Sequence, residues 1–139
     1  MTQEDKQLLL KDLCARLPHK CRVFYEYIDD LDNKTYGYGL TLNTWCIDEF
    51  IANKAVLKPY LRPMSSMTEE EKREYFSFIG GQEPYDFDHS AYPIEYKYIY
   101  EWDVANYVNW LNSHHFDYRG LIPLGLAIAV TEENNPYKD

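Results

Sequence analysis

The residues whose types suggest chemistry gather in one short stretch near the C-terminal end of the chain. His114 and His115 are adjacent, and Asp117 follows two residues later. Imidazole and carboxylate groups can bind a metal ion, and a histidine beside an aspartate could act as the general base of a small hydrolase. His89 and Asp88, from an earlier polar segment, could complete a metal site. The stretch therefore offers a metal centre and a hydrolytic site as chemical interpretations.

The spacing of these residues favours a structural role. Adjacent histidines at the end of a helix point in different directions, whereas zinc sites use spaced pairs such as HxxxH. A histidine in the last turn of a helix also interacts well with the helix dipole and can bond to the last carbonyl groups. We interpret the stretch as a structural corner and predict no metal and no cofactor. Its residues are His114, His115, Asp117, Arg119 and Gly120.

The remaining motif searches also argue against an enzyme. The sequence has no GxSxG elbow, no cysteine beside a histidine, and neither of the glycine-rich loops GxGxxG and GxxxxGK[ST]. The acidic turn that begins at Asp29 resembles a calcium loop only in its charge. It lacks the glycine at loop position six and the glutamate at position twelve. We therefore predict no catalytic residues, with a hydrolase at His114, His115 and Asp117 as an alternative.

Apolar spacing predicts three main helices. Leucines and Cys14 recur at helical spacing in the first, which Thr2 begins and Pro18 ends. Thr68 begins the second with a capping box to Glu71, and a glycine pair ends it. The helices are expected at about residues 3–16, from Thr68 to Gly80–Gly81, and at about 102–113, with a short one at about 47–53.

Alternating and aromatic-rich segments predict strands between these helices. The strands are expected at about residues 21–28, 35–42, 92–100 and 126–130, with an extended edge segment of two prolines at about 56–63. In the second strand the residues expected to share one face are Tyr36, Tyr38, Leu40 and Leu42. The result is one α+β domain over residues 1–139, with about three helices on a small, mostly antiparallel sheet and a frayed tail at 131–139.

The charge and the cysteines limit the classes of partner. The 139-residue chain carries 23 acidic and 14 basic residues, a net charge of −9. Such a surface is repelled by phosphate backbones and anionic lipid, so we predict no direct binding to nucleic acid or membrane. The three cysteines form no CxxC pair, which indicates buried, reduced thiols. With no signal segment and no apolar run of ~18 residues, the protein is expected in the cytoplasm.

Three segments resemble proteins of one group. They are MTQEDKQLLLKDLCARLP at the start, KPYLRPMSSMTEEE (Lys58–Glu71) and WLNSHHFDYRGLIPLGLA (Trp110–Ala127). Each is similar to segments of small bacterial proteins, many of them from phage or prophage settings. The resemblance implies kinship and a mobile-element origin, and it brings no activity and no catalytic residue.

These observations predict a non-enzymatic, acidic interaction protein of phage or mobile-element origin that binds a host macromolecule, most simply a protein. Tyrosine supplies 14 residues, and aromatic side chains are enriched at the centres of interfaces. An alternative is an inhibitor whose carboxylates mimic the phosphates of nucleic acid and block a nucleic-acid-binding host defence protein. The candidate contact residues are Asp29, Asp30, Asp32, Glu69, Glu70, Glu71, Tyr96 and Tyr98. The sequence predicts no particular oligomeric state.

Overall fold

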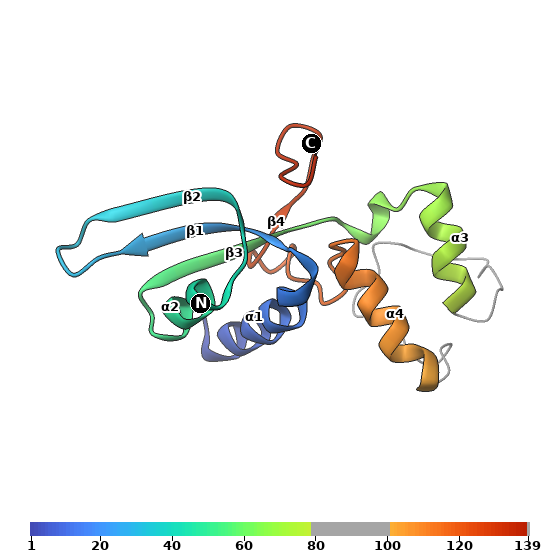
Figure 1. Cartoon of the computed structure of the whole chain (residues 1–139), viewed down its shortest axis with the longest axis horizontal. Coiled ribbons are helices and arrows are strands. Elements are labelled where there is room, and N and C mark those ends of the chain that lie inside the picture. Colours follow the sequence, from blue (N-terminus) through green and yellow to red (C-terminus); the bar gives the residue numbers. More distant parts are fainter. Residues whose placement is uncertain (79–100, 139) are drawn as a thin grey trace.

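The computed structural model describes residues 1–78 and 101–138 (Figure 1). Within them, four α-helices and a four-stranded sheet form an α+β fold, which confirms the predicted class. The helices are α1 (Gln3–Arg16), α2 (Thr44–Ile51), α3 (Glu69–Phe78) and α4 (Glu101–Ser113). The strands are β1 (Arg22–Ile28), β2 (Lys34–Thr41), β3 (Ala55–Leu61) and β4 (Ile128–Ala129). The strand expected at 92–100 and the pair Gly80–Gly81 lie outside the described residues.

Helix α1 begins and ends as its sequence requires. The Thr2 hydroxyl accepts the Asp5 N–H at 3.0 Å, and the Asp5 carboxylate accepts the Thr2 N–H, which completes a capping box. After α1 a 3-10 turn (Leu17–His19) contains Pro18. Leu9 and Leu13 are fully buried, so α1 presents these leucines to the core.

The sheet has the order β2-β1-β3-β4, and only the short β3–β4 pair is parallel. The extended segment expected at 56–63 is β3, which lies between β1 and β4 only at Tyr60 and Leu61 and is at the edge of the described sheet before them. Pro59 is tolerated there because β4 pairs only with Tyr60 and Leu61, so the ladder does not need an N–H at Pro59. The expected strand at 126–130 is correspondingly reduced to the two residues of β4.

Helices α1 and α2 cover one face of the sheet (Figure 1). That face supplies Val23, Tyr25 and Leu57 to a core that also contains Leu9 and Leu13 of α1. Cys21 and Cys46 are buried in the same core, whereas Cys14 is exposed, contrary to the expectation that it lies on the buried stripe of α1. The described helices leave the opposite face of β1 and β2 uncovered.

A β-bulge separates the residues that were expected to share one face of β2. Tyr25 pairs with Gly37 and Val23 pairs with Leu40, so β2 has one more residue than β1 between these pairs. Gly39 lies in the bulge with a φ of 68°. As a result Leu40 shares the face of the buried Val23, while Tyr36 and Tyr38 contact Phe24 on the opposite face.

The C-terminal segment is anchored, and the expectation of a frayed tail over 131–139 is wrong for the described residues 131–138. Tyr137 is partly buried, and its hydroxyl bonds to backbone groups of both β1 and β3. The polar composition of the tail suggested fraying, but one tyrosine supplies the anchor.

Among the described helices, none combines the length and the apolar character that a membrane crossing requires.

The bulge gives a stability prediction with a matched control. Gly39 and Gly125 have φ values of 68° and 75°, but a Cβ at Gly39 would lie 3.0 Å from Pro136 Cβ, whereas nothing lies within 4 Å at Gly125. Gly125→Ala should lower the free energy of unfolding by ~1 kcal/mol through backbone strain. Gly39→Ala should lower it further, because Pro136 must also move. Urea unfolding measures both, and equal losses would contradict the contact with the tail.

Candidate functional site

The histidine corner is the turn that follows α4 and runs along the end of β3. His115, two residues after the end of α4, has a φ of 64°, a left-handed conformation that residues other than glycine adopt less often. The backbone N–H of Arg62 donates to the His115 carbonyl at 2.7 Å, and the Asp117 N–H donates to the Arg62 carbonyl at 2.9 Å. The corner is therefore held to the end of β3 by its own backbone.

Asp117 is fully buried and both of its carboxylate oxygens bind backbone. Oδ1 accepts the N–H of Leu121 and Oδ2 accepts the N–H of Ile122, each at 2.8 Å. Burial raises the pKa of Asp117, although these two hydrogen bonds oppose the shift. Because both oxygens accept hydrogen bonds from the following turn, the Asp117 carboxylate holds the backbone of that turn in place. It is therefore poorly placed to act as a base.

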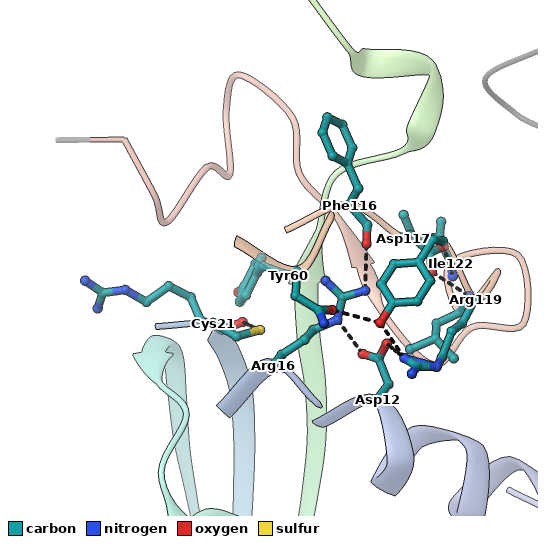
Figure 2. A network of polar contacts seen from close by, with 12 residues as sticks. Asp12, Arg16, Cys21, Tyr60, Phe116, Asp117, Arg119 and Ile122 are labelled. Atoms are coloured by element: carbon teal, nitrogen blue, oxygen red, sulfur yellow. Dashed lines mark hydrogen bonds and ion pairs between the residues drawn. The ribbon is translucent and has the colours of Figure 1, made fainter. Parts of the chain in front are cut away.

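A buried ion pair joins α1 to the corner (Figure 2). Arg16 Nε lies 2.7 Å from Asp12 Oδ2, and both side chains are fully buried. Arg16 Nη2 donates to the Phe116 carbonyl at 2.6 Å, and the guanidinium carbon lies 5.1 Å from the centre of the Tyr118 ring. Burial opposes the charge of Arg16, yet the adjacent Asp12 carboxylate raises its pKa above the ordinary value.

The pair belongs to a wider polar network. Arg119 Nη1 lies 3.2 Å from the second oxygen of Asp12 and 2.9 Å from the Tyr118 hydroxyl. The Tyr118 hydroxyl in turn donates to Asn112 Oδ1 at 2.9 Å. Asp12 and Arg16 were not among the residues that the sequence singled out. Their i, i+4 spacing was a signal, but exposed helical pairs share it.

The two histidines face different partners. His114 Nδ1 lies 2.9 Å from the Trp110 carbonyl, in the last turn of α4. The His115 ring stacks on Tyr137 with a centroid separation of 3.8 Å, and its Nδ1 is buried without a hydrogen-bond partner among the described residues. Burial, together with the charge of Arg16 and other nearby cations, lowers the pKa of His115 to about 4.

The metal interpretation finds no support in the part of the chain that the structure describes. No group of three His, Cys, Asp or Glu side chains there is arranged to hold a metal ion. His89 and Asp88, the proposed additional ligands, lie outside the described residues.

The candidate acidic residues lie in two places. Asp29, Asp30 and Asp32 are at the tip of the β1–β2 hairpin, and Glu69, Glu70 and Glu71 begin α3 at the other end of the molecule (Figure 1). Several of these acids have partners within the chain, among them Glu69, which lies 3.0 Å from Lys72. Asp29 Oδ1 accepts two backbone N–H groups of its turn, and the Glu71 carboxylate binds Arg62 at 2.7 Å. Although burial opposes its charge, Arg62 and Thr68 lower the pKa of Glu71.

Aromatic side chains of β1 and β2 gather on the uncovered face of the sheet, beside Val56 of β3. We call these residues the open aromatic face, which consists of Phe24, Tyr36, Tyr38 and Val56. Tyr36 is 51% exposed and Tyr38 is 71% exposed. Their ring centroids lie 6.4 and 5.2 Å from that of Phe24. The other candidate tyrosines, Tyr96 and Tyr98, lie outside the described residues.

Comparison with family models, curated proteins and solved structures finds no match to this chain.

The lowered pKa of His115 predicts a pH dependence of stability. An unfolded histidine has a pKa of ~6.5, whereas folded His115 has one of about 4. Between these values the unfolded chain binds more protons, so this contribution to stability is complete above pH ~6.5 and is lost as the pH falls toward 4. Because the ring is partly exposed, we expect a loss on the order of 1 kcal/mol between pH 7 and 5.

The variant His115→Asn isolates this effect, because asparagine tolerates a positive φ. Urea unfolding at pH 7 and pH 5 should show a smaller loss of stability in this variant than in the wild type. The same loss in both proteins would contradict the assignment.

Proposed function

We propose that this chain is a non-enzymatic interaction protein that binds a protein partner through its open aromatic face. The observation that carries the proposal is the exposure of Tyr36 and Tyr38 beside Phe24, on a sheet face that none of the described helices covers (Figure 1). Clustered exposed aromatic side chains mark interaction surfaces, because burying them against a partner releases water from large apolar areas.

The charges around this face indicate what kind of partner would fit. Glu26 on β1 lies 3.6 Å from Lys34 on β2, and Lys58 on β3 is the cross-strand partner of Phe24, so the rings lie among charges of both signs. At the hairpin tip, Leu31 is 81% exposed between Asp30 and Asp32. A partner with an apolar groove and basic residues near one end would match both features. Affinity would come mainly from the rings, and the acidic tip would favour the correct orientation.

The alternatives have less support from the geometry. A hydrolase needs an accessible base, but Asp117 binds two backbone N–H groups and His115 is covered by Tyr137. A mimic of nucleic acid needs a continuous acidic surface, but its proposed carboxylates lie at opposite ends of the molecule (Figure 1). The resemblance to phage-associated proteins favours a partner from a bacterial host, and free thiols fit a reducing compartment such as its cytoplasm.

The proposal predicts binding that depends on aromatic residues and resists salt. A partner captured from a bacterial lysate by the wild-type chain should stay bound at ~0.5 M salt, because screening weakens exposed charges and leaves apolar burial intact. The double variant Tyr36→Ala/Tyr38→Ala should bind it at least about tenfold more weakly. Titration calorimetry with the purified partner measures the change.

The matched control is Glu69→Lys/Glu70→Lys, which alters exposed charges on α3 far from the rings. It should bind as the wild type does, and circular dichroism should show both variants folded. If the tyrosine variant binds normally while the charge variant or moderate salt abolishes binding, the mimic replaces this proposal.

A further inference from the structure

The C-terminal segment returns to the sheet and inserts one side chain into it. Its first turn is closed by Asn134, whose Oδ1 accepts the Thr131 N–H at 2.6 Å. This turn is exposed and polar. The Tyr137 hydroxyl then donates to the Tyr60 carbonyl at 2.7 Å and accepts the Arg22 N–H at 2.9 Å. The segment is thus an arm with an exposed, hydrogen-bonded turn and an anchor beyond it.

The Tyr137 hydroxyl occupies the point where β1 and β3 part. The last backbone pair of these strands at this end is Val23 with Pro59, so Arg22 and Tyr60 lie one step beyond it. A phenol has one donor and one acceptor site that suit these two backbone groups. Cys21 Sγ lies 3.6 Å from the same hydroxyl. The hydroxyl therefore continues the hydrogen bonding of the sheet where the backbones no longer reach each other.

Two further contacts position the end of the arm, a ring stack and a close approach of Pro136 to Gly39. The Tyr137 ring stacks on the His115 ring at 3.8 Å with an interplanar angle of 10°. Pro136 approaches Gly39 so closely that a Cβ there would lie 3.0 Å from Pro136 Cβ. Burial raises the pKa of Tyr137, so the hydroxyl keeps the proton that it donates. We call the groups around the ring, Cys21, Arg22, Tyr60 and His115, the tyrosine socket.

The residues of the socket also have contacts that do not involve the arm. Arg22 and Tyr60 are positioned by the pairing of β1, β2 and β3, and His115 by its backbone bond to Arg62. The positive φ of His115 is the left-handed conformation that follows many helices, and its ring stacks on Tyr137.

We propose that the tyrosine socket is a binding site for a Pro-Tyr segment, filled in the isolated chain by Pro136 and Tyr137 and open to the same dipeptide on a protein partner. The arm is a tethered ligand with an effective concentration in the millimolar range. A partner must therefore supply further contacts to displace it. The socket uses residues other than those of the open aromatic face, so the inference stands without the proposed function.

The test uses the full-length chain with Tyr137→Ala, in which the arm remains but its anchor is gone. The probe is the acetylated peptide NNPYKD, which copies residues 134–139. In an NMR titration it should bind this variant saturably, with shifts at the Arg22 amide and the His115 ring. Wild-type chain should bind it at least about tenfold more weakly, because its socket is occupied. The control peptide NNPFKD lacks the hydroxyl and should bind the variant about tenfold more weakly than NNPYKD.

Two results would overturn the proposal. One is a folded Tyr137→Ala variant that shows no shift at the Arg22 amide with millimolar peptide. The other is equal binding of NNPYKD by the variant and the wild type, or of both peptides by the variant. If Tyr137→Ala does not fold, Tyr137→Phe takes its place, since it keeps the ring stack. NNPYKD must then bind that variant more tightly than the wild type, and equal binding rejects the socket.

Discussion

The structure depends on the burial of one ion pair, Asp12 with Arg16. Removing both charges from water costs several kcal/mol per ion, so the pair persists only if its geometry is good and its remaining groups are bonded. Both oxygens of Asp12 are paired, with Arg16 and Arg119, and Arg16 Nη2 bonds to the Phe116 carbonyl. Arg16 Nη1 is buried without a hydrogen-bond partner among the described residues, which adds to the cost of burying the pair. Since Phe116 lies inside the histidine corner, the pair connects the N-terminal helix to the corner. The corner in turn is bonded to the end of β3 through Arg62.

The residues of the corner that suggested a catalytic or metal site have structural contacts. Asp117 uses its oxygens to hold the turn after the corner, and His115 supports the ring of Tyr137. The surfaces that we propose for partners are the open aromatic face and the tyrosine socket. Both are built on the sheet that the corner and α1 hold in place, and His115 belongs to the corner and to the socket.

Local features of the fold could be predicted from the sequence, and long-range ones could not. The capping box of Thr2 and the shared face of Tyr36 and Tyr38 follow from neighbouring residues. The bulge that moves Leu40 to the other face is invisible to a strict two-residue alternation. The burial of Arg16 and the anchoring of Tyr137 depend on partners about a hundred residues away in the chain. Such contacts leave no local pattern in the sequence. A polar tail or a charged residue on a helix is therefore expected to be exposed to solvent.

The free energy of unfolding of Arg16→Met, compared with that of Arg119→Met, tests the central claim most directly. Arg16→Met leaves the Asp12 carboxylate buried with one cation and should lower stability by about 3–5 kcal/mol. Arg119 is partly exposed and its loss leaves the Asp12–Arg16 pair intact, so Arg119→Met should lower stability by only about 1 kcal/mol. Equal losses in the two variants would show that the buried pair does not hold the fold together.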